Sequence, residues 1–276
     1  MAVLTLASTG CKKKDPLGKK GDKQLKESTV IVDGEEIKYK TGDLASVIEG
    51  KSVESLVWKT GSIGASDIAA MKNNCKTTLK YLDMERVNFA TGFGEYKTYN
   101  GSAGITDALI VPVEMCQGFS ALESVVLPAV AKTLDRFAFA SCTSLKEVRF
   151  GSRLITIGPY VFSGCAMEHI ELPESLNTLN SEVFYDVPLK ELTIPASVSG
   201  FFDDTFIFYM KVSKLETVTC MGSTPPVINR TTTLNKCNNV FNLTPEGFKI
   251  YVPRKAVDKY KTAEYWSAHA DQIVGF

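Results

Sequence analysis

The sequence predicts a β-rich α/β solenoid, a right-handed superhelix of stacked coils with a parallel sheet along its concave face and short helices in its end caps. Three observations predict it: a repeat of about 22 residues, apolar residues that alternate inside each repeat, and turn-rich segments at the ends. The chain has 276 residues, of which 44% are hydrophobic and 22% charged. This composition supplies a large core and excludes a disordered chain, a collagen and a disulfide scaffold.

Five segments share the pattern L-x-x-L-x-L, and successive segments start 23, 22, 22 and 26 residues apart. They begin at Leu122, Leu145, Met167, Leu189 and Leu215. This alternation is typical of a short strand that turns every second side chain inward. One unit cannot bury its apolar side alone, so the units must stack, and we assign residues 79–221 to the repeats.

The remainder of each unit also repeats. One apolar column contains Leu134, Ile157 and Leu179, and an aromatic column contains Phe139, Phe162 and Phe184. Cys142 and Cys165 share a position with Phe119 and Val187, which indicates a buried hydrophobic site. Disulfides between Cys142 and Cys165, or between Cys220 and Cys237, are the alternatives.

The segments that flank the repeats predict end caps. Residues 30–78 form an N-terminal cap, in which Ser66 caps a short helix. Residues 222–276 form the C-terminal cap, with a last strand at 248–253 and a helix at 254–266. The spacing between the strands at 79 and 122 exceeds one repeat, which predicts an inserted loop at about 88–106.

The first 29 residues predict an anchor and a tether. A short apolar run ends at Gly10 and Cys11, which resembles the cleavage box of bacterial lipoproteins and implies a lipidated Cys11 in residues 1–11. No Lys or Arg precedes this run, so we expect the true initiating methionine to lie upstream. Residues 12–29 are predicted to be a flexible tether, because seven lysines and few apolar side chains cannot form a core.

The repeat unit, with its strand, proline, Ile, Phe and Cys positions, resembles the BspA-like leucine-rich repeats of secreted and surface proteins in Bacteroides-type bacteria. The segment from Tyr251 to Tyr260, followed by Trp266, is similar to that family's C-terminal cap, and Leu56–Met84 is similar to its N-terminal unit. The resemblance covers about residues 50–276. It implies an extracytoplasmic, non-enzymatic protein, with adhesion to host proteins known for some members.

Two surfaces are candidates for binding. The outward positions of the predicted strands form a mildly acidic concave face, with Tyr81, Asp83, Glu147, Arg149, His169, Glu171, Glu191 and Thr193. The inserted loop carries aromatic residues beside glycines, at Phe89, Phe93, Tyr96 and Tyr99. The alternative for the loop is that its aromatics fold back against the sheet.

The predicted function is binding of an unknown protein or glycan ligand, with host extracellular proteins among the candidates and membrane contact only through the lipid anchor. We find no catalytic constellation, metal-ligand spacing or cofactor motif, and His169 and His269 are expected on the surface. Without residues 12–26 the chain has 24 basic and 29 acidic residues, which disfavours nucleic acid. The alternatives are a glycan-processing hydrolase that uses Glu147, Glu171 and Glu191, and a passive envelope protein.

Overall fold

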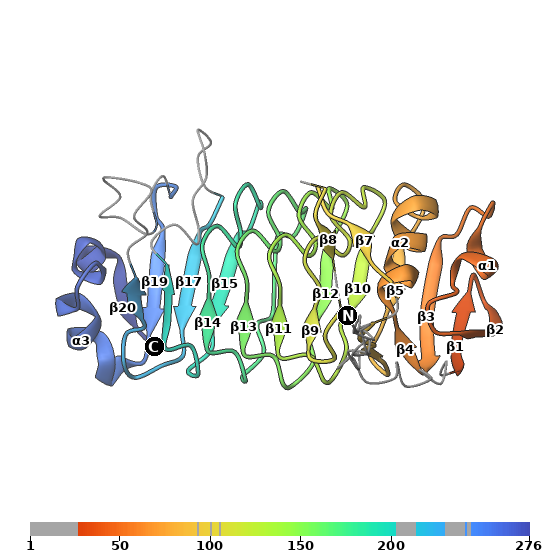
Figure 1. The fold of residues 1–276 in the computed structure, drawn as a ribbon. Coiled ribbons are helices and arrows are strands. Elements are labelled where there is room, and N and C mark those ends of the chain that lie inside the picture. Colours follow the sequence, from red (N-terminus) through yellow and green to blue (C-terminus); the bar gives the residue numbers. More distant parts are fainter. Residues whose placement is uncertain are drawn as a thin grey trace, which may run out of the picture.

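The chain winds into coils that stack side by side along one axis, with the N-terminal hairpin at one end and helix α3 at the other (Figure 1). The computed structural model describes residues 27–92, 94–99, 101–104, 106–202, 214–229, 241 and 244–276. Cys11, Phe93, Cys237 and the tether up to residue 26 lie outside the described residues. Most coils contribute one strand to a front face and a second strand to a back face.

The front strands form two sheets, which we call the front sheets. The first has the order β12-β10-β5-β3-β1-β2, and the second has the order β15-β17-β19-β20. The bounds are β1 Glu27–Val32, β2 Glu35–Lys40, β3 Ser55–Thr60, β5 Tyr81–Asp83, β10 Ser124–Val126, β12 Glu147–Arg149, β15 Glu191–Ile194, β17 Thr217–Cys220, β19 Lys249–Val252 and β20 Ile273–Gly275. From β3 onward each pair is parallel, as the repeat predicts.

A second parallel sheet runs along the back of the coils. Its six strands are β9 Ile110–Val111, β11 Thr133–Leu134, β13 Thr156–Ile157, β14 Thr178–Leu179, β16 Gly200–Phe202 and β18 Val227–Asn229. The predicted column of Leu134, Ile157 and Leu179 lies in this sheet, fully buried. Phe201 and Ile228 continue it in register, so the coils extend beyond residue 221, where the sequence repeat stops.

Regular turns join the back strands to the front strands. In the turns of four successive coils, two residues four positions apart take positive φ, as Tyr160 and Gly164 do. Amides there donate to the next coil, for example Phe162 N to Val183 O at 3.1 Å. The rings of Phe139, Phe162 and Phe184 stack inside these turns, with centroids 6.1 and 6.2 Å apart. These turns therefore fix the coil spacing with both hydrogen bonds and aromatic packing.

The N-terminal cap begins earlier than the sequence indicates. Strand β1 starts at Glu27, within the predicted tether of residues 12–29, and Ser28 and Thr29 are buried in the hairpin with β2. The cap also contains α1 Ala45–Ile48, β4 Ser62–Ile63 and α2 Ala65–Asn74. The N-cap of α2 is Gly64 rather than Ser66.

The buried carboxylate of Asp67 organises this cap. It accepts hydrogen bonds from the amides of Gly42, Leu44 and Gly64 at 2.8 to 2.9 Å. Burial raises the pKa of Asp67, and these amides oppose the shift. One side chain thus joins the start of α2 to the segment that leads into α1.

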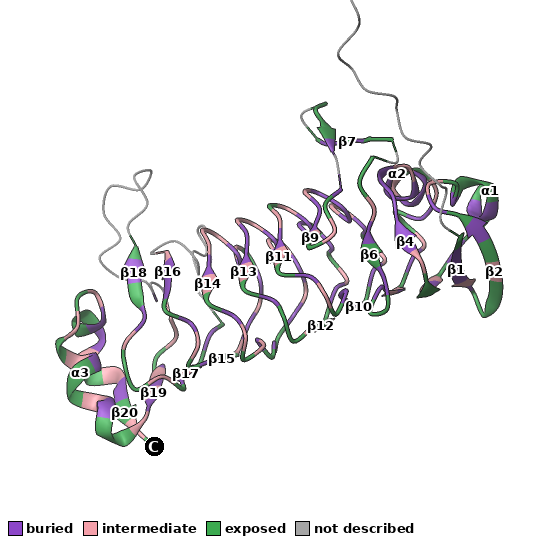
Figure 2. Cartoon of the chain, turned by 60° about the horizontal axis from the view of Figure 1, so that its bottom comes forward, coloured by how far each residue is buried: buried purple, intermediate pink, exposed green. Residues whose placement is uncertain are grey.

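The inserted segment is shorter than predicted, and its first strand belongs to the coils. Strand β6, Asn88–Phe89, pairs in parallel with β4, which places Phe89 beside Ile63. The insertion then forms a small antiparallel hairpin of β7 Tyr96–Lys97 and β8 Ala103–Gly104. Figure 2 shows β7 projecting from the coil stack.

The C-terminal cap closes the other end. After β19, two 3₁₀ helices, Arg254–Ala256 and Trp266–Gln272, flank α3, Val257–Thr262, where the sequence predicted one helix. Trp266 packs edge-on against Phe201 and Tyr260, and its indole N–H donates to Pro226 O at 3.0 Å. His269 is 4% exposed and packs against the Phe241 and Phe248 rings, so its predicted surface position is wrong.

Candidate binding surface on the front sheets

The outward positions of the front sheets form an open row of polar side chains. Inward residues such as Leu82, Val125 and Leu192 are buried, because alternate residues of a strand point to opposite faces. Six predicted outward residues are exposed: Glu147, Arg149, His169, Glu171, Glu191 and Thr193. Tyr81 and Asp83 are half-buried.

Tyr81 and Asp83 are partly occupied by local contacts. The Tyr81 hydroxyl donates to Asp83 Oδ2 at 3.3 Å, and Asp83 Oδ1 accepts the Glu85 amide at 2.9 Å. Partial burial and the Asp83 charge raise the pKa of Tyr81, so it stays a neutral donor. Arg149 lies 3.4 Å from Glu85, which neutralises the arginine of this surface.

A second row, just before the strands, alternates in charge from coil to coil. Its members are Glu54, Lys80, Glu123, Lys146, Glu168, Lys190 and Glu216. Lys80 lies 2.9 Å from Glu54, and Lys190 lies 2.5 Å from Glu168. The Glu168 carboxylate raises the pKa of Lys190, and Lys190 in turn lowers the pKa of Glu168. Because like charges would meet if a coil shifted by one place, this row favours one stacking order.

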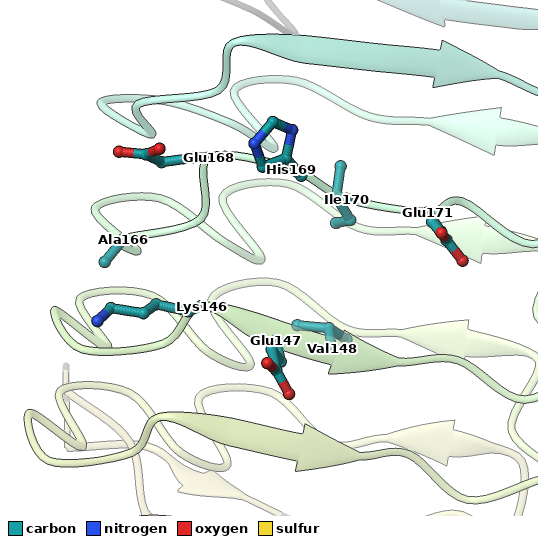
Figure 3. Close-up of a pocket in the computed structure, with 8 residues that line it drawn as sticks. All are labelled: Lys146, Glu147, Val148, Ala166, Glu168, His169, Ile170 and Glu171. Carbon is teal, nitrogen blue, oxygen red and sulfur yellow. The ribbon is translucent and has the colours of Figure 1, made fainter.

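The front ladder is interrupted between the two front sheets. The segment at 167–172 forms no strand of its own. It contacts the next coil through a bridge from Glu171 to Thr193 and through the Lys190 amide, which donates to Glu168 O at 2.9 Å. A pocket of about 590 Å³ lies at the interruption. Its lining residues are Lys146, Glu147, Val148, Ala166, Glu168, His169, Ile170 and Glu171. Figure 3 shows Lys146 and Glu168 at one end, Glu171 at the other, and Val148 and Ile170 between them.

The inserted hairpin does not present all of its predicted aromatics. Phe89 and Tyr96 are 1% and 2% exposed, so the prediction that they form a contact surface is wrong. Phe89 belongs to a coil, and the Tyr96 hydroxyl donates to Val113 O at 2.5 Å while Lys72 Nζ lies 5.3 Å from the ring centre. Tyr99 is 90% exposed, and Phe93 lies outside the described residues.

The geometry gives no support to the hydrolase alternative. Glu147, Glu171 and Glu191 are all exposed, and they stand on three separate coils of an open face. A glycosidase needs two carboxyl groups in different environments that flank one enclosed bond. Within the described ranges, no three His, Cys, Asp or Glu side chains are grouped so as to hold a metal ion.

The cysteines lie in the core of the coils. Cys142 and Cys165 are buried free thiols, whose Sγ atoms donate to Cys116 O at 3.1 Å and Phe139 O at 3.2 Å. The disulfide between them is therefore not formed, and the buried-hydrophobe interpretation is confirmed. Burial raises the pKa of Cys142 to about 12, which disfavours the reactive thiolate. Cys220 is also free and buried.

Sequence reasoning missed Lys146 and Glu168 as pocket residues. A signal was present in the turn that precedes each front strand. Leu145 follows Cys142 by three positions, whereas Met167 follows the equivalent Cys165 by only two. One residue fewer in a turn changes how the next strand meets its neighbour. The interruption occurs at this step.

Comparison with known proteins supports the repeat assignment. The family model of the BspA type leucine rich repeat region matches residues 111–239 in six copies. The chain is similar to the crystal structure of the pneumococcal vaccine antigen PcpA, with 20% identity, a TM-score of 0.44, and coverage of 72% of this chain and 55% of that chain. It is also similar to a leucine-rich repeat protein from Bacteroides ovatus ATCC 8483, with 18% identity, a TM-score of 0.37, and coverage of 65% and 49%.

The chain thus spans about half the length of these two solved structures. A search of curated proteins finds no match. None of the helices in the described part of the chain has the length and apolar character to cross a bilayer. The stacked parallel strands and the six matched copies agree with the resemblance drawn from the sequence. Residues 111–239 are therefore BspA-type leucine-rich repeats, which confirms the predicted family.

Proposed function

We propose that this chain is a non-enzymatic adhesion module that binds a protein partner through the outward side chains of the front sheets. The observation that carries this proposal is the exposed polar row on a rigid hydrogen-bonded ladder. Glu147, Glu171 and Glu191 have charged heads in solvent, and Arg149 is half of an exposed ion pair. A backbone held in hydrogen-bonded strands loses little further conformational entropy when a partner binds, which favours affinity.

We further propose that the front sheets lie on the concave side of a right-handed superhelix. A concave sheet brings outward side chains of several coils towards one partner. An interface of standard size needs about 800 Å² from each side, which several coils together supply. The exposed Tyr99, on the inserted hairpin that projects from the coil stack (Figure 2), is a second and separate candidate contact for a partner.

The proposed location is extracytoplasmic, at the bacterial cell envelope on its outer or periplasmic side, with a lipid on Cys11 as the anchor. The support is the lipoprotein-like sequence around Cys11 and the lysine-rich stretch that follows it. Mass spectrometry of the membrane fraction should find an acylated Cys11 peptide, and Cys11→Ser should release the protein from membranes. An unmodified Cys11 would contradict the anchor and leave the binding proposal standing.

Binding is tested by surface plasmon resonance of the full chain against a panel of purified extracellular proteins and polysaccharides. We expect saturable binding to at least one protein, and a loss of at least tenfold in affinity, about 1.4 kcal/mol, when Glu191→Lys and Thr193→Lys are combined. The matched control is Lys132→Glu, an exposed charge change beside back strand β11. Equal effects of the two variants, or binding to polysaccharides alone, would contradict the proposal.

A further inference from the structure

The front ladder opens at one step while the back of the same two coils stays joined. The two coils meet on the back through β13 and β14, and in the turn through Tyr160 N to Ser181 O at 3.1 Å and Gly164 N to Tyr185 O at 2.8 Å. On the front, Ala166 N donates to Leu145 O at 3.0 Å. Beyond that bond, no backbone hydrogen bond joins 146–150 to 168–172, both of which the structure describes.

The opening leaves main-chain groups of β12 without partners. In the preceding coil Glu123 O accepts the amides of Lys146 and Glu147, and Leu127 N donates to Arg149 O. The counterparts one coil later are Lys146 O and Phe150 N–H. Neither has a partner in the described structure, although both carry the hydrogen-bonding capacity of a strand edge.

The opening also exposes apolar side chains that neighbouring coils bury. Val125 and Leu127 are 0% and 2% exposed, whereas their counterparts Val148 and Phe150 are only partly buried. Val148 and Ile170 line the pocket between the two segments (Figure 3). A strand edge beside an apolar floor is the combination that extended peptides use when they add to a sheet.

The charges around the opening favour a cationic occupant. Glu168 is already paired with Lys190. Glu147 and Glu171 are exposed and have no ion-pair partner among the described residues, against the single unpaired cation of Lys146. The lining is therefore acidic, and a Lys or Arg side chain on the occupant would meet a carboxylate.

We propose that the opening between β12 and residues 168–171 binds an extended, cationic peptide segment of a partner protein. An amide of this segment donates to Lys146 O, and one of its carbonyls accepts Phe150 N–H. Its apolar side chains cover Val148 and Ile170, and its basic side chains face Glu147 and Glu171. This inference rests on the proposed function, because it names the part of the front face that a protein partner would use.

The probe is a fluorescein-labelled seven-residue peptide of alternating lysine and valine, titrated onto the full chain and followed by fluorescence anisotropy. We expect saturable binding with a dissociation constant below about 1 mM. A peptide with glutamate in place of lysine tests charge, and one with proline in place of each valine tests the main-chain donors. Both should bind at least tenfold more weakly, and equal binding of either would overturn the inference.

Two variants locate the site. Glu147→Gln with Glu171→Gln should weaken the lysine peptide at least fivefold, while the exposed, distant Glu35→Gln should leave it unchanged. Insertion of one serine between Cys165 and Ala166 restores the three-residue turn spacing and should close the ladder. This insertion should abolish peptide binding, because it satisfies the open backbone groups of β12.

The outcomes separate this inference from the proposed function. Weaker peptide binding by the double glutamine variant supports the inference. This variant tests the site even if the insertion variant fails to fold. Undiminished peptide binding by the glutamine variant overturns it. If that variant still binds the protein partner that Glu191→Lys with Thr193→Lys loses, the proposed function holds and the peptide site is wrong.

Discussion

The front and the back of the same coils differ in how they tolerate a change in turn length. On the back, β13 and β14 pair in register, and the rings of Phe162 and Phe184 stack at 6.2 Å. On the front, one missing residue after Cys165 leaves β12 unpaired with the next coil. The comparison teaches that the back turns set the spacing of this stack, and that the front ladder can open locally without separating the coils.

The largest expected loss of stability comes from removing a buried ring in the turns. Phe162→Ala removes a buried ring that contacts Phe139 and Phe184, and should lower the free energy of unfolding by about 3–5 kcal/mol. Phe150→Ala, at the partly buried edge of the opening, should cost less than half as much, although its ring also meets Phe162 at 6.1 Å. Urea denaturation measures both, and equal losses would break the proposed difference between the faces.

A second contrast lies within the inserted hairpin. Tyr96→Ala removes a buried ring and a hydrogen bond to Val113 O, and should destabilise the protein by about 3 kcal/mol in chemical denaturation. Gly104 lies directly under this ring, where a Cβ would meet it at 2.3 Å. Tyr99→Ala, at a 90% exposed position, should stay within about 0.5 kcal/mol of the parent. A stability loss at Tyr99 would show that it packs against the protein instead of remaining available.

The C-terminal cap should respond to acid through His269. Burial lowers the pKa of His269 below its ordinary value of about 6.5, and Gln272 Oε1 lies 2.6 Å from Nδ1. Protonation below about pH 6.5 therefore favours the unfolded chain, so the stability that this group provides is complete above that pH and is lost as pH falls towards the lowered pKa. Tm scans between about pH 7.5 and pH 5 should show this loss.

The variant His269→Gln is the control for that pH response. It should flatten the Tm profile below about pH 6.5, because the titrating group is gone. The same slope with and without His269 would assign the acid sensitivity to another part of the protein.

The smallest expected effect comes from the charge row. Glu168→Gln removes the exposed ion pair with Lys190 and should leave Tm unchanged within error, because solvent screens exposed pairs. We expect the alternating charges of this row to favour one order of coils and to add little to the free energy of unfolding. A clear fall in Tm would show that the pair helps to hold the coils beside the opening.

The buried columns of the coils could be predicted from the sequence, whereas the pairing of strands between neighbouring coils could not. Leu134 and Phe162 could be placed because successive coils repeat their columns at spacings of 23 and 22 residues. The back strands contain only two or three residues, too few for a pattern, and Phe89 joined a coil through pairing with Ile63, which no local signal marks. His269 was misplaced because its burial depends on Phe241 and Phe248, which come from distant segments.

The candidate surface divides in the same way. The outward positions of Glu147, Glu171 and Glu191 follow from alternation alone, since strand side chains have a period of two. The opening does not follow from alternation. It depends on whether the segment after the shortened turn still comes within hydrogen-bonding distance of β12. The turn lengths after Cys142 and Cys165 are visible in the sequence, but their effect on the ladder requires the three-dimensional stack.

The most direct test of the opened front ladder is amide hydrogen exchange resolved to single residues, with and without the lysine–valine peptide. We expect the amides of Phe150, Glu168 and His169 to exchange rapidly, because they have no hydrogen-bond acceptor in the described structure. Their counterparts in the neighbouring coil are hydrogen-bonded and should be protected, namely Leu127, Lys146 and Glu147. We also expect the peptide to slow exchange at Phe150. Equal protection of the two sets in the free protein would show a closed ladder and contradict the account.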